Sequence, residues 1–412
     1  MVQILVHSLV GGLVKKGALE LRYADGRVAL YGDGTGAPVI VRFTDRGGPF
    51  ALVRNPERAL GELYMDGRLV FDEGGLSDLF ALLSANDARR APPPVMRALR
   101  TARNTAIDFW TRNARARSRA NVAHHYDIDA RLYDLFLDSD RQYSCAYYAR
   151  PDMGLEEAQR AKKRHIAAKL ALFPGARTLD IGCGWGGMAL YLACAAQADV
   201  LGLTLSTEQL AIAEMRAQRA FSHAGARGRA QFRLQDYRDV EGPFDRIVSV
   251  GMFEHVGRAQ YRTFFDTLGR LLQPDGVALL HTIGRPDGPG RPNAWINRYI
   301  FPGGYTPALS EIMRAVENSG LFVTDVEVLR LHYAETLKDW RARFMTNRAE
   351  AAAIAGERFC RMWEFYLVLA EYAFRADGEC VFQIQIARRH DATPITRDYM
   401  AAAEERFAQA GF

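Results

Sequence analysis

Cysteine and long apolar runs are both scarce in this sequence of 412 residues, and each shortage excludes a class of protein. The five cysteines form no C-x-x-C pair and no cluster with histidine; they are Cys145, Cys183, Cys194, Cys360 and Cys380. Scattered thiols of this kind argue for a reducing compartment and against a structural zinc site. No stretch approaches the roughly 18 apolar residues that a membrane-spanning helix needs, and the apolar segment at 2–14 lacks the basic start and the cleavage site of a signal peptide. We therefore expect a cytoplasmic protein without a metal site, which at most lies on a membrane.

The net charge of +5 is small, but one segment is strongly basic. Nine arginines and only two carboxylates lie between Asp87 and Ala120, a segment that also contains the prolines at 92–94. Such a segment favours phosphate groups, of a nucleic acid or of an anionic membrane, although a solvated helix has the same composition. We interpret 91–120 as a basic, helical linker between a domain at 1–90 and a domain at 121–412.

The first 90 residues predict a small α+β domain. Apolar residues alternate between Ala18 and Phe43, and the pairs Asp25-Gly26 and Asp33-Gly34 punctuate them, as is typical of short strands joined by turns. An amphipathic helix is expected at 2–14 and another helix at 76–83. No catalytic constellation is visible in this part of the chain.

The remainder of the chain alternates strand and helix patterns, which predicts an α/β domain with a mostly parallel, seven-stranded sheet. The expected strands lie at 178–181, 199–203, 230–234, 245–250, 276–282, 321–329 and 381–387. A helical stretch rich in aromatic residues is inserted at 335–375. Its aromatic side chains either cover a pocket as an apolar lid or form part of a core.

A glycine-rich turn follows the first of these strands. Four glycines fall within six positions, at Gly182, Gly184, Gly186 and Gly187, and a helical pattern begins at once. A strand that runs through such a turn into a helix brings bare backbone and a helix N-terminus against a ligand. A glycine turn without a ligand is the alternative.

Two kinds of ligand fit this turn. Three of its glycines satisfy G-x-G-x-x-G, the dinucleotide pattern, but that pattern also wants an acidic residue at the end of the second strand, where the chain has Thr204-Leu205-Ser206. The acid, Asp180, stands before the glycines instead. The order D-x-G-x-G-x-G resembles the first motif of the class I S-adenosylmethionine (SAM) methyltransferases, whose cationic ligand suits a carboxylate. We therefore favour SAM, and a Rossmann-like class I methyltransferase fold.

Motifs along the second domain resemble those of the cyclopropane-fatty-acid synthase family, SAM-dependent enzymes that turn a cis double bond of a lipid acyl chain into a cyclopropane ring. The matching segments run from 121 to about 388 in family order: Tyr143-Ser144-Cys145-Ala146-Tyr147, 180–186, 204–209, 253–257, 280–283, 301–304 and 332–334. The small N-terminal domain is similar in position and size to that of the bacterial members that act on phospholipids. The mycolic-acid-modifying members lack it.

The resemblance implies two groups of site residues. SAM contacts are expected at Tyr143, Ser144, Gly182, Gly184, Thr204, Gln209, Asp236 and Tyr237, with Asp180 and Gly186 added from their place in the glycine motif. The family also uses a bound bicarbonate as the base that removes a proton during ring closure. By resemblance it is held at Cys145 and Ile283, through their backbone, and at Glu254, His281 and Tyr333. A small anion there would stabilise a neighbouring carbocation, and its like charge beside Glu254 predicts a shared proton.

The resemblance further implies a homodimer, peripherally attached to the inner membrane, that acts on phospholipids and not on nucleic acid. Two alternatives stay open. The same cation can give a methyl-branched or methylene-bearing acyl chain, because the product depends on which proton leaves. A basic membrane- or nucleic-acid-binding protein could also keep a degenerate methyltransferase fold, but the intact glycines oppose this, as does the lack of an Asn/Asp-Pro-Pro-Tyr motif after the fourth strand.

Overall fold

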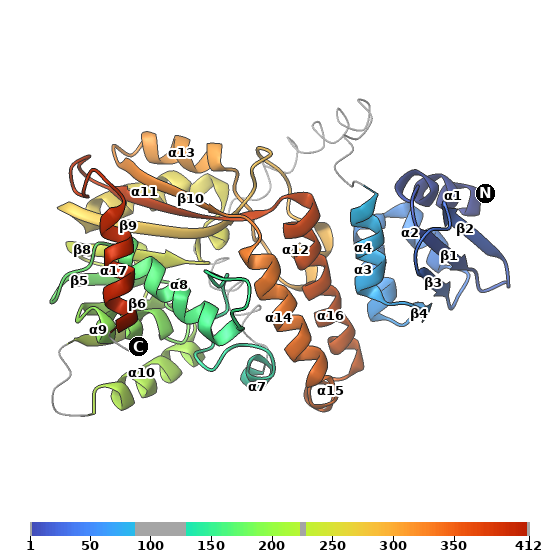
Figure 1. The fold of residues 1–412 in the computed structure, drawn as a ribbon, viewed down its shortest axis with the longest axis horizontal. Coiled ribbons are helices and arrows are strands. Elements are labelled where there is room, and N and C mark those ends of the chain that lie inside the picture. Colours follow the sequence, from blue (N-terminus) through green and yellow to red (C-terminus); the bar gives the residue numbers. More distant parts are fainter. Residues whose placement is uncertain (1, 87–128, 223–227, 410–412) are drawn as a thin grey trace. The chain divides into compact units, whose positions relative to one another are not determined.

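The computed structural model describes residues 2–86, 129–222 and 228–409, which pack as two compact units (Figure 1). The first unit contains the described residues up to 86 together with 292–302 and 337–378. The second contains the other described residues. The predicted basic linker at 91–120 lies outside the described residues.

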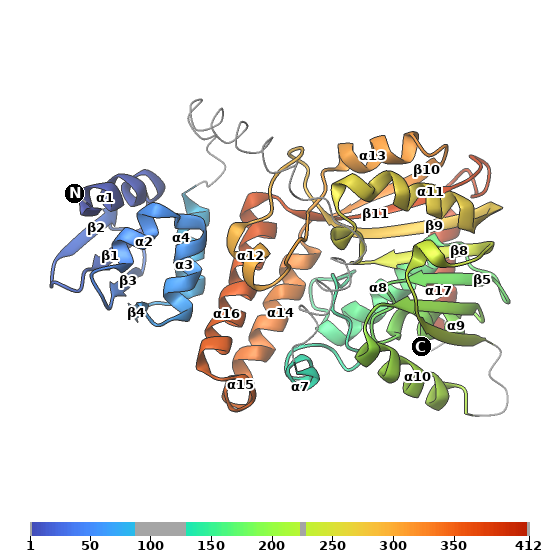
Figure 2. The same ribbon diagram turned by 180° about the vertical axis from the view of Figure 1, so that it is seen from behind.

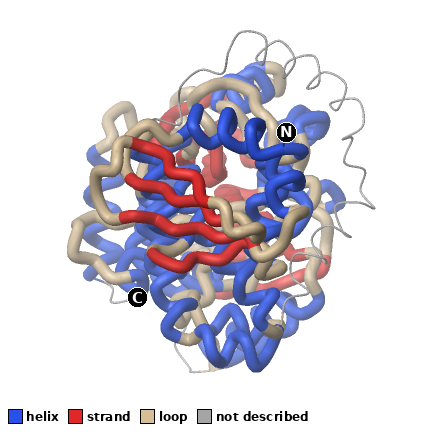
Figure 3. The backbone as a smooth tube through the Cα atoms, turned by 90° about the vertical axis from the view of Figure 1, so that its right-hand side faces the viewer, coloured by secondary structure: helices blue, strands red, loops and turns tan. Residues whose placement is uncertain are grey.

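The N-terminal part of the first unit is a four-stranded sheet with helices, as expected for a small α+β module (Figure 3). The strands are β1 (Ala18–Arg22), β2 (Val28–Gly32), β3 (Pro38–Phe43) and β4 (Leu69–Glu73), in the order β2-β1-β3-β4. The helices are α1 (Val2–Leu13), α2 (Gly48–Arg54), α3 (Pro56–Met65) and α4 (Leu76–Ala85). Alternate residues of β1 and β3, such as Leu19 and Val41, point into one buried core because side chains alternate along a strand.

The aromatic-rich helices pack with this N-terminal module. They are α12 (Ala294–Tyr299), α14 (His332–Thr346, up to residue 336 in the second unit), α15 (Arg348–Ala355) and α16 (Glu357–Tyr372). The ring of Phe365 on α16 lies 4.6 Å from Trp295 and 5.9 Å from Phe80, centroid to centroid. A side chain at Gly61 would come within 2.7 Å of the Phe365 ring, so the glycine permits the close approach of α3 to α16.

Burial assigns most of these aromatic side chains to a core. Trp295, Trp340, Phe344, Trp363, Phe365 and Phe374 are each at most 4% exposed. From the order of the chain we expected this insertion to belong to the second domain. In the structure residues 337–378 share their packing with the N-terminal module instead, because α16 packs against α3 and α4.

The second unit is built on a seven-stranded sheet of order β10-β11-β9-β8-β5-β6-β7. Its strands are β5 (Arg177–Ile181), β6 (Asp199–Thr204), β7 (Arg229–Leu234), β8 (Phe244–Val250), β9 (Leu272–Gly284), β10 (Phe322–Leu329) and β11 (Cys380–Ala387). The pairs among β5 to β9 are parallel, and β11 pairs antiparallel with both β9 and β10. All seven predicted strands are therefore confirmed, as is the mostly parallel sheet.

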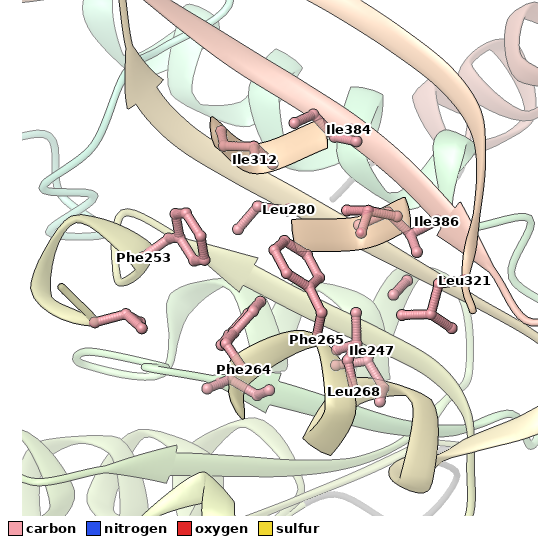
Figure 4. Close-up of a cluster of buried hydrophobic side chains, with 14 of the residues drawn as sticks. Ile247, Phe253, Phe264, Phe265, Leu268, Leu280, Ile312, Leu321, Ile384 and Ile386 are labelled. Atoms are coloured by element: carbon pink, nitrogen blue, oxygen red, sulfur yellow. The ribbon is translucent and has the colours of Figure 1, made fainter. Parts of the chain in front are cut away.

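Helices cover both faces of this sheet. The first face carries α11 (Tyr261–Leu271) and α13 (Leu309–Glu317), whose apolar side chains form the core drawn in Figure 4. The second face carries α8 (Leu155–Lys169), α9 (Gly187–Ala195), α10 (Thr207–Ala220) and α17 (Asp398–Gln409). In Figure 1 α17 is on the near side of the sheet, and in Figure 2 α11 is on the near side. Leu280 faces the first core and Leu279 the second, as strand periodicity requires.

Short elements complete the second unit at the carboxyl ends of the strands: α7 (Ala130–Asp134) and the 3-10 turns Tyr237–Asp239, Phe253–His255 and Arg258–Gln260. Among the helices that the structure describes, none has both the length and the apolar character needed to cross a bilayer.

Candidate active site

One pocket opens at the carboxyl ends of β5, β6, β7 and β8, where open α/β sheets bind ligands. It holds about 1250 Å³ of space, including the part that is open to solvent. Nine of the ten residues predicted to contact SAM line it: Tyr143, Ser144, Asp180, Gly182, Gly184, Thr204, Gln209, Asp236 and Tyr237. Segments more than 90 positions apart in the sequence therefore meet around one cavity.

The tenth predicted residue, Gly186, has a different task. It is absent from the pocket lining and forms the N-cap of α9 with a φ of +85°, a conformation that favours glycine. A Cβ at this position would lie 2.8 Å from the Phe232 ring and 3.0 Å from Ala213. Gly184 has a φ of +55° and lines the pocket, and a Cβ added at this position would meet no atom within 4 Å. Gly186 thus shapes the turn, and Gly184 leaves room for the ligand.

Asp180 supplies an unsatisfied acceptor in this pocket. Its side chain is 1% exposed, and Oδ2 has no hydrogen-bond partner within the described chain. Burial raises the pKa of this carboxyl to about 7. A buried carboxylate oxygen without a partner is costly, and a cationic ligand group would satisfy it. This acceptor therefore fits the ammonium group of SAM.

The adenine-side residues are held by contacts that the sequence did not reveal. Arg238 donates to Asp236, from Nε at 2.8 Å and Nη2 at 2.5 Å, and its guanidinium lies 5.6 Å from the centre of the Tyr237 ring. Thr204 Oγ1 donates to Gln209 Oε1 at 2.9 Å. Arg238 lines the same pocket and fixes the orientation of Asp236 and Tyr237, two of the predicted SAM contacts.

The opposite wall is the segment Arg141–Ser144, which is held in a tight turn. Arg141 has a φ of +53°, rare for a residue with a side chain, and its guanidinium donates twice to Asp134 at 2.6 Å. The backbone N–H of Gln142 donates to Asp138 Oδ1 at 2.8 Å. These bonds direct Gln142, Tyr143 and Ser144 toward the cavity.

Two of the five residues expected at the bicarbonate are in direct contact, and a third is their near neighbour on β9. Glu254 Oε1 accepts a hydrogen bond of 2.6 Å from the backbone N–H of Ile283. Two residues earlier on β9, His281 faces the same side of the sheet, and its carbonyl accepts from the N–H of Gly251, which lines the pocket. The group therefore adjoins the pocket, although none of its members is among the lining residues.

The protonation of this group follows from its burial. Glu254 Oε2 is buried without a hydrogen-bond partner in the described chain, and burial raises the pKa of the carboxyl to about 7. His281 is 2% exposed, and burial lowers its pKa well below the usual range, so the imidazole is neutral. Gln383 Nε2 lies 3.2 Å from His281 Nδ1. The group can thus hold or release a proton at Glu254 near neutral pH.

The other two residues, Cys145 and Tyr333, are joined through α14. Thr336 Oγ1, one turn after Tyr333, accepts from the N–H of Ala146 at 3.0 Å. The Tyr147 ring stacks between His165 and His332, with centroid distances of 4.1 and 4.9 Å. Cys145 is 1% exposed and Tyr333 8%, and burial raises the pKa of the Cys145 thiol. The thiol is therefore protonated, in keeping with a role through its backbone.

Besides Arg238, sequence reasoning missed His255 and Lys162. His255 lines the pocket, and burial lowers its pKa to about 4. The Glu254-His255 pair after a strand was the signal available for it. Lys162 lies mid-helix in α8 between other charged residues and gave no signal in the sequence.

The fold and the pocket together define the class of protein. A mostly parallel sheet of this order, with a glycine turn and an unsatisfied carboxylate at the end of β5, is that of a SAM-dependent methyltransferase. Solved structures agree: a cyclopropane synthase complexed with SAH (CmaA1, a mycolic acid cyclopropane synthase) is 36% identical, with a TM-score of 0.61, over 65% of this chain and 97% of that chain. The cyclopropane synthase MmaA2 from Mycobacterium tuberculosis is 35% identical, with a TM-score of 0.60, over 65% and 98%.

The chain belongs to the cyclopropane synthase family, because the family model described as mycolic acid cyclopropane synthetase matches residues 113–384. The cyclopropane-fatty-acyl-phospholipid synthase of Escherichia coli K12 is 39% identical over 80% of this chain and 82% of its own. The tuberculostearic acid methyltransferase of Mycobacterium tuberculosis is 34% identical over 90% and 88%. The protein is thus an enzyme of the type that transfers a methylene group from SAM to a fatty acyl chain.

Proposed function

We propose that this enzyme adds a methylene group to the cis double bond of unsaturated phospholipid acyl chains, and that a bound bicarbonate takes up the proton released when the cyclopropane ring closes. The observation that carries the chemistry is the buried carboxyl of Glu254, which adjoins the pocket with one oxygen unsatisfied. SAM, when bound, supplies an electron-poor methyl group on sulfur. The residues of the chain hold and orient SAM, and they exclude water from the pocket.

Positioning is the main contribution of the pocket, because an isolated double bond is a poor nucleophile and needs an aligned partner. Asp180 would hold the ammonium group of SAM, and the arginine-fixed pair Asp236 and Tyr237 would receive the adenine. The buried setting also excludes water, which would otherwise capture a cation on the acyl chain.

Glu254 and a neighbouring anion need not repel each other. With a pKa of about 7, this carboxyl is protonated in a large part of the molecules at neutral pH. A protonated carboxyl donates a hydrogen bond to bicarbonate, whereas a carboxylate would raise the energy of the anion. Neutral His281 and the phenol of Tyr333 would provide further polar groups without adding charge.

Phospholipid as substrate rests on the Escherichia coli relative of that name and on the first helix. Between Val2 and Leu13 α1 has no charged residue, and Ile4, Leu5 and Leu13 are 72%, 49% and 51% exposed. Lys15 and Lys16 follow directly. An exposed apolar helix face beside basic residues is typical of elements that lie on anionic membranes. Homodimerisation stays a prediction.

The test uses the purified protein, SAM and vesicles with cis-monounsaturated phospholipids, followed by mass spectrometry of the acyl chains. We expect a mass gain of one methylene per double bond, absent from vesicles with saturated chains. Removal of bicarbonate should slow the wild type, and Glu254→Gln should be slow with or without bicarbonate while still binding SAH. Turnover that ignores bicarbonate would contradict the proposed base.

A second product has support in the names of two relatives, the tuberculostearic acid methyltransferase and a probable fatty acid methyltransferase of Pseudomonas putida, which is 40% identical over 68% of this chain. The same site would then give a methyl-branched or methylene-bearing chain. NMR of the extracted acyl chains separates these products, because ring protons and vinyl protons resonate far apart.

A further inference from the structure

Lys162 is a buried ammonium that holds one wall of the pocket. The residue is 0% exposed, and Nζ donates to Gln142 Oε1 at 2.6 Å and to Ser144 Oγ at 2.8 Å. One turn earlier on α8, Gln159 Nε2 donates to the carbonyls of Gln142 and Ser144, at 3.1 and 3.0 Å. Side chains and backbone of this wall are thus both fixed by one face of α8.

No carboxylate of the described chain is hydrogen-bonded to this ammonium. Among the described residues, Gln142 and Ser144 are its two hydrogen-bond partners, and both are neutral. The charge of Asp138 acts on Lys162, but the two oxygens of Asp138 accept from the N–H groups of Gln142 and Asp140. The other nearby acid, Asp140, is bound by Lys163 at 2.5 Å and also by Arg216. A buried cation is normally paired with an anion, so an anionic group on the far side of Gln142 and Ser144 would complete the arrangement.

A group of opposite charge lines the pocket whose wall Lys162 supports. Asp180 lines it with an unpaired oxygen, and Lys162 is near enough to act on Asp180 through its charge. The charge of Lys162 also reaches Cys145 and His281. A negative group and a positive group set apart in this way match the ammonium and carboxylate of a free amino acid.

We propose that Lys162 is a positioning residue for the amino-acid end of SAM: it orients Ser144 and Gln142 toward the methionine carboxylate and balances the charge of that carboxylate, while Asp180 takes the ammonium. Lys162 does not line the pocket and acts through the two side chains that do. The inference rests on the proposed use of SAM and assigns the carboxylate subsite within it.

Calorimetric binding of SAH and of its analogue without the carboxylate tests this. Lys162→Met should weaken SAH binding roughly tenfold to a hundredfold, the usual range for a hydrogen-bond network to a charged group. The analogue should bind the wild type and the variant about equally. Lys162→Arg, which keeps the charge, should recover part of the affinity for SAH.

Lys169→Met is the matched control. Lys169 is a second lysine of α8 with 0% exposure, but its ammonium binds Glu327 and not the pocket wall. It should lose stability and keep its affinity for SAH, as thermal unfolding and calorimetry measure. Equal SAH affinity in Lys162→Met and wild type, or an equal loss for both ligands, would overturn the inference. If Lys162→Met does not fold, Ser144→Ala must show the same selective loss of SAH binding. Failure of the wild type to bind SAH would instead contradict the proposed function.

Discussion

The burial of helices α1 and α8 is the opposite of what their sequences suggest. Helix α1 has no charged residue, yet it exposes Ile4, Leu5 and Leu13. Helix α8 is rich in lysine, arginine and glutamate, yet Lys162, Lys163, His165 and Lys169 are buried. Burial therefore depends on which partners the fold brings to a helix. In both helices the unexpected residues mark where we infer function, a lipid contact in α1 and the pocket wall in α8.

Two of the buried groups of α8, His165 and Lys169, have carboxylate partners on a distant strand and helix. His165 lies 2.6 Å from Glu327 and 2.5 Å from Glu404, and Lys169 also binds Glu327. Lone exposed pairs contribute little to stability, whereas removing one member of a buried pair leaves an uncompensated charge.

The largest expected effect comes from a substitution that breaks this network of buried charges. Glu327→Gln should lower the free energy of unfolding by about 3–5 kcal/mol, because it strips the ammonium of Lys169 of its carboxylate. Chemical denaturation measures the loss. Asp152→Asn is the control, since that carboxylate is 77% exposed. A loss no larger than that of the control would mean that the buried charges of α8 are not held by their partners.

The second-largest expected effect is on the pH dependence of stability. It distinguishes the buried acids of the site, which lack such partners, from the paired charges of α8. The pKa of Glu254 is raised from 4.5 to about 7, so the folded protein binds this proton more tightly than the unfolded chain. Its contribution is fully present below pH 4.5 and is lost as the pH rises through about 7. Between pH 5 and 8 the wild type should lose about 3 kcal/mol of stability from this residue.

Denaturation of Glu254→Gln over the same pH range checks the sign. The variant should lack that part of the decline, and Glu350→Gln, at an exposed glutamate, should keep it. A decline of the same size in Glu254→Gln would show that its carboxyl is not the group that titrates.

The smallest effect concerns α1. The double change Ile4→Ser and Leu5→Ser should weaken binding to anionic phospholipid vesicles about tenfold, because two exposed apolar side chains no longer enter the interface. Vesicle sedimentation measures this, and stability should change little because both side chains are exposed. Ile395→Ser, at a fully exposed isoleucine outside α1, is the control. Equal binding by the double variant and the control would remove α1 as the lipid contact.

Local features were predictable from the sequence. The strands and the glycine turn followed from apolar runs and glycine spacing, and the ten predicted SAM contacts, nine of which line the pocket, followed mainly from the resemblance to the cyclopropane-fatty-acid synthase family. Partners that meet only in the folded chain were not. The insertion at 337–378 packs through contacts such as Phe365 against Phe80, which no local pattern encodes. Lys162 resembles any solvent-facing lysine until Gln142 and Ser144 are placed beside it.

The central claim is that a methyl group from SAM becomes a ring carbon after losing one proton in the pocket. Incubating the enzyme with SAM that carries a trideuterated methyl group, and with monounsaturated phospholipid vesicles, tests this most directly. We predict a cyclopropane acyl chain that keeps two of the three deuterium atoms, seen by mass spectrometry and by NMR of the ring. An acyl chain that keeps all three in a methyl branch would contradict it.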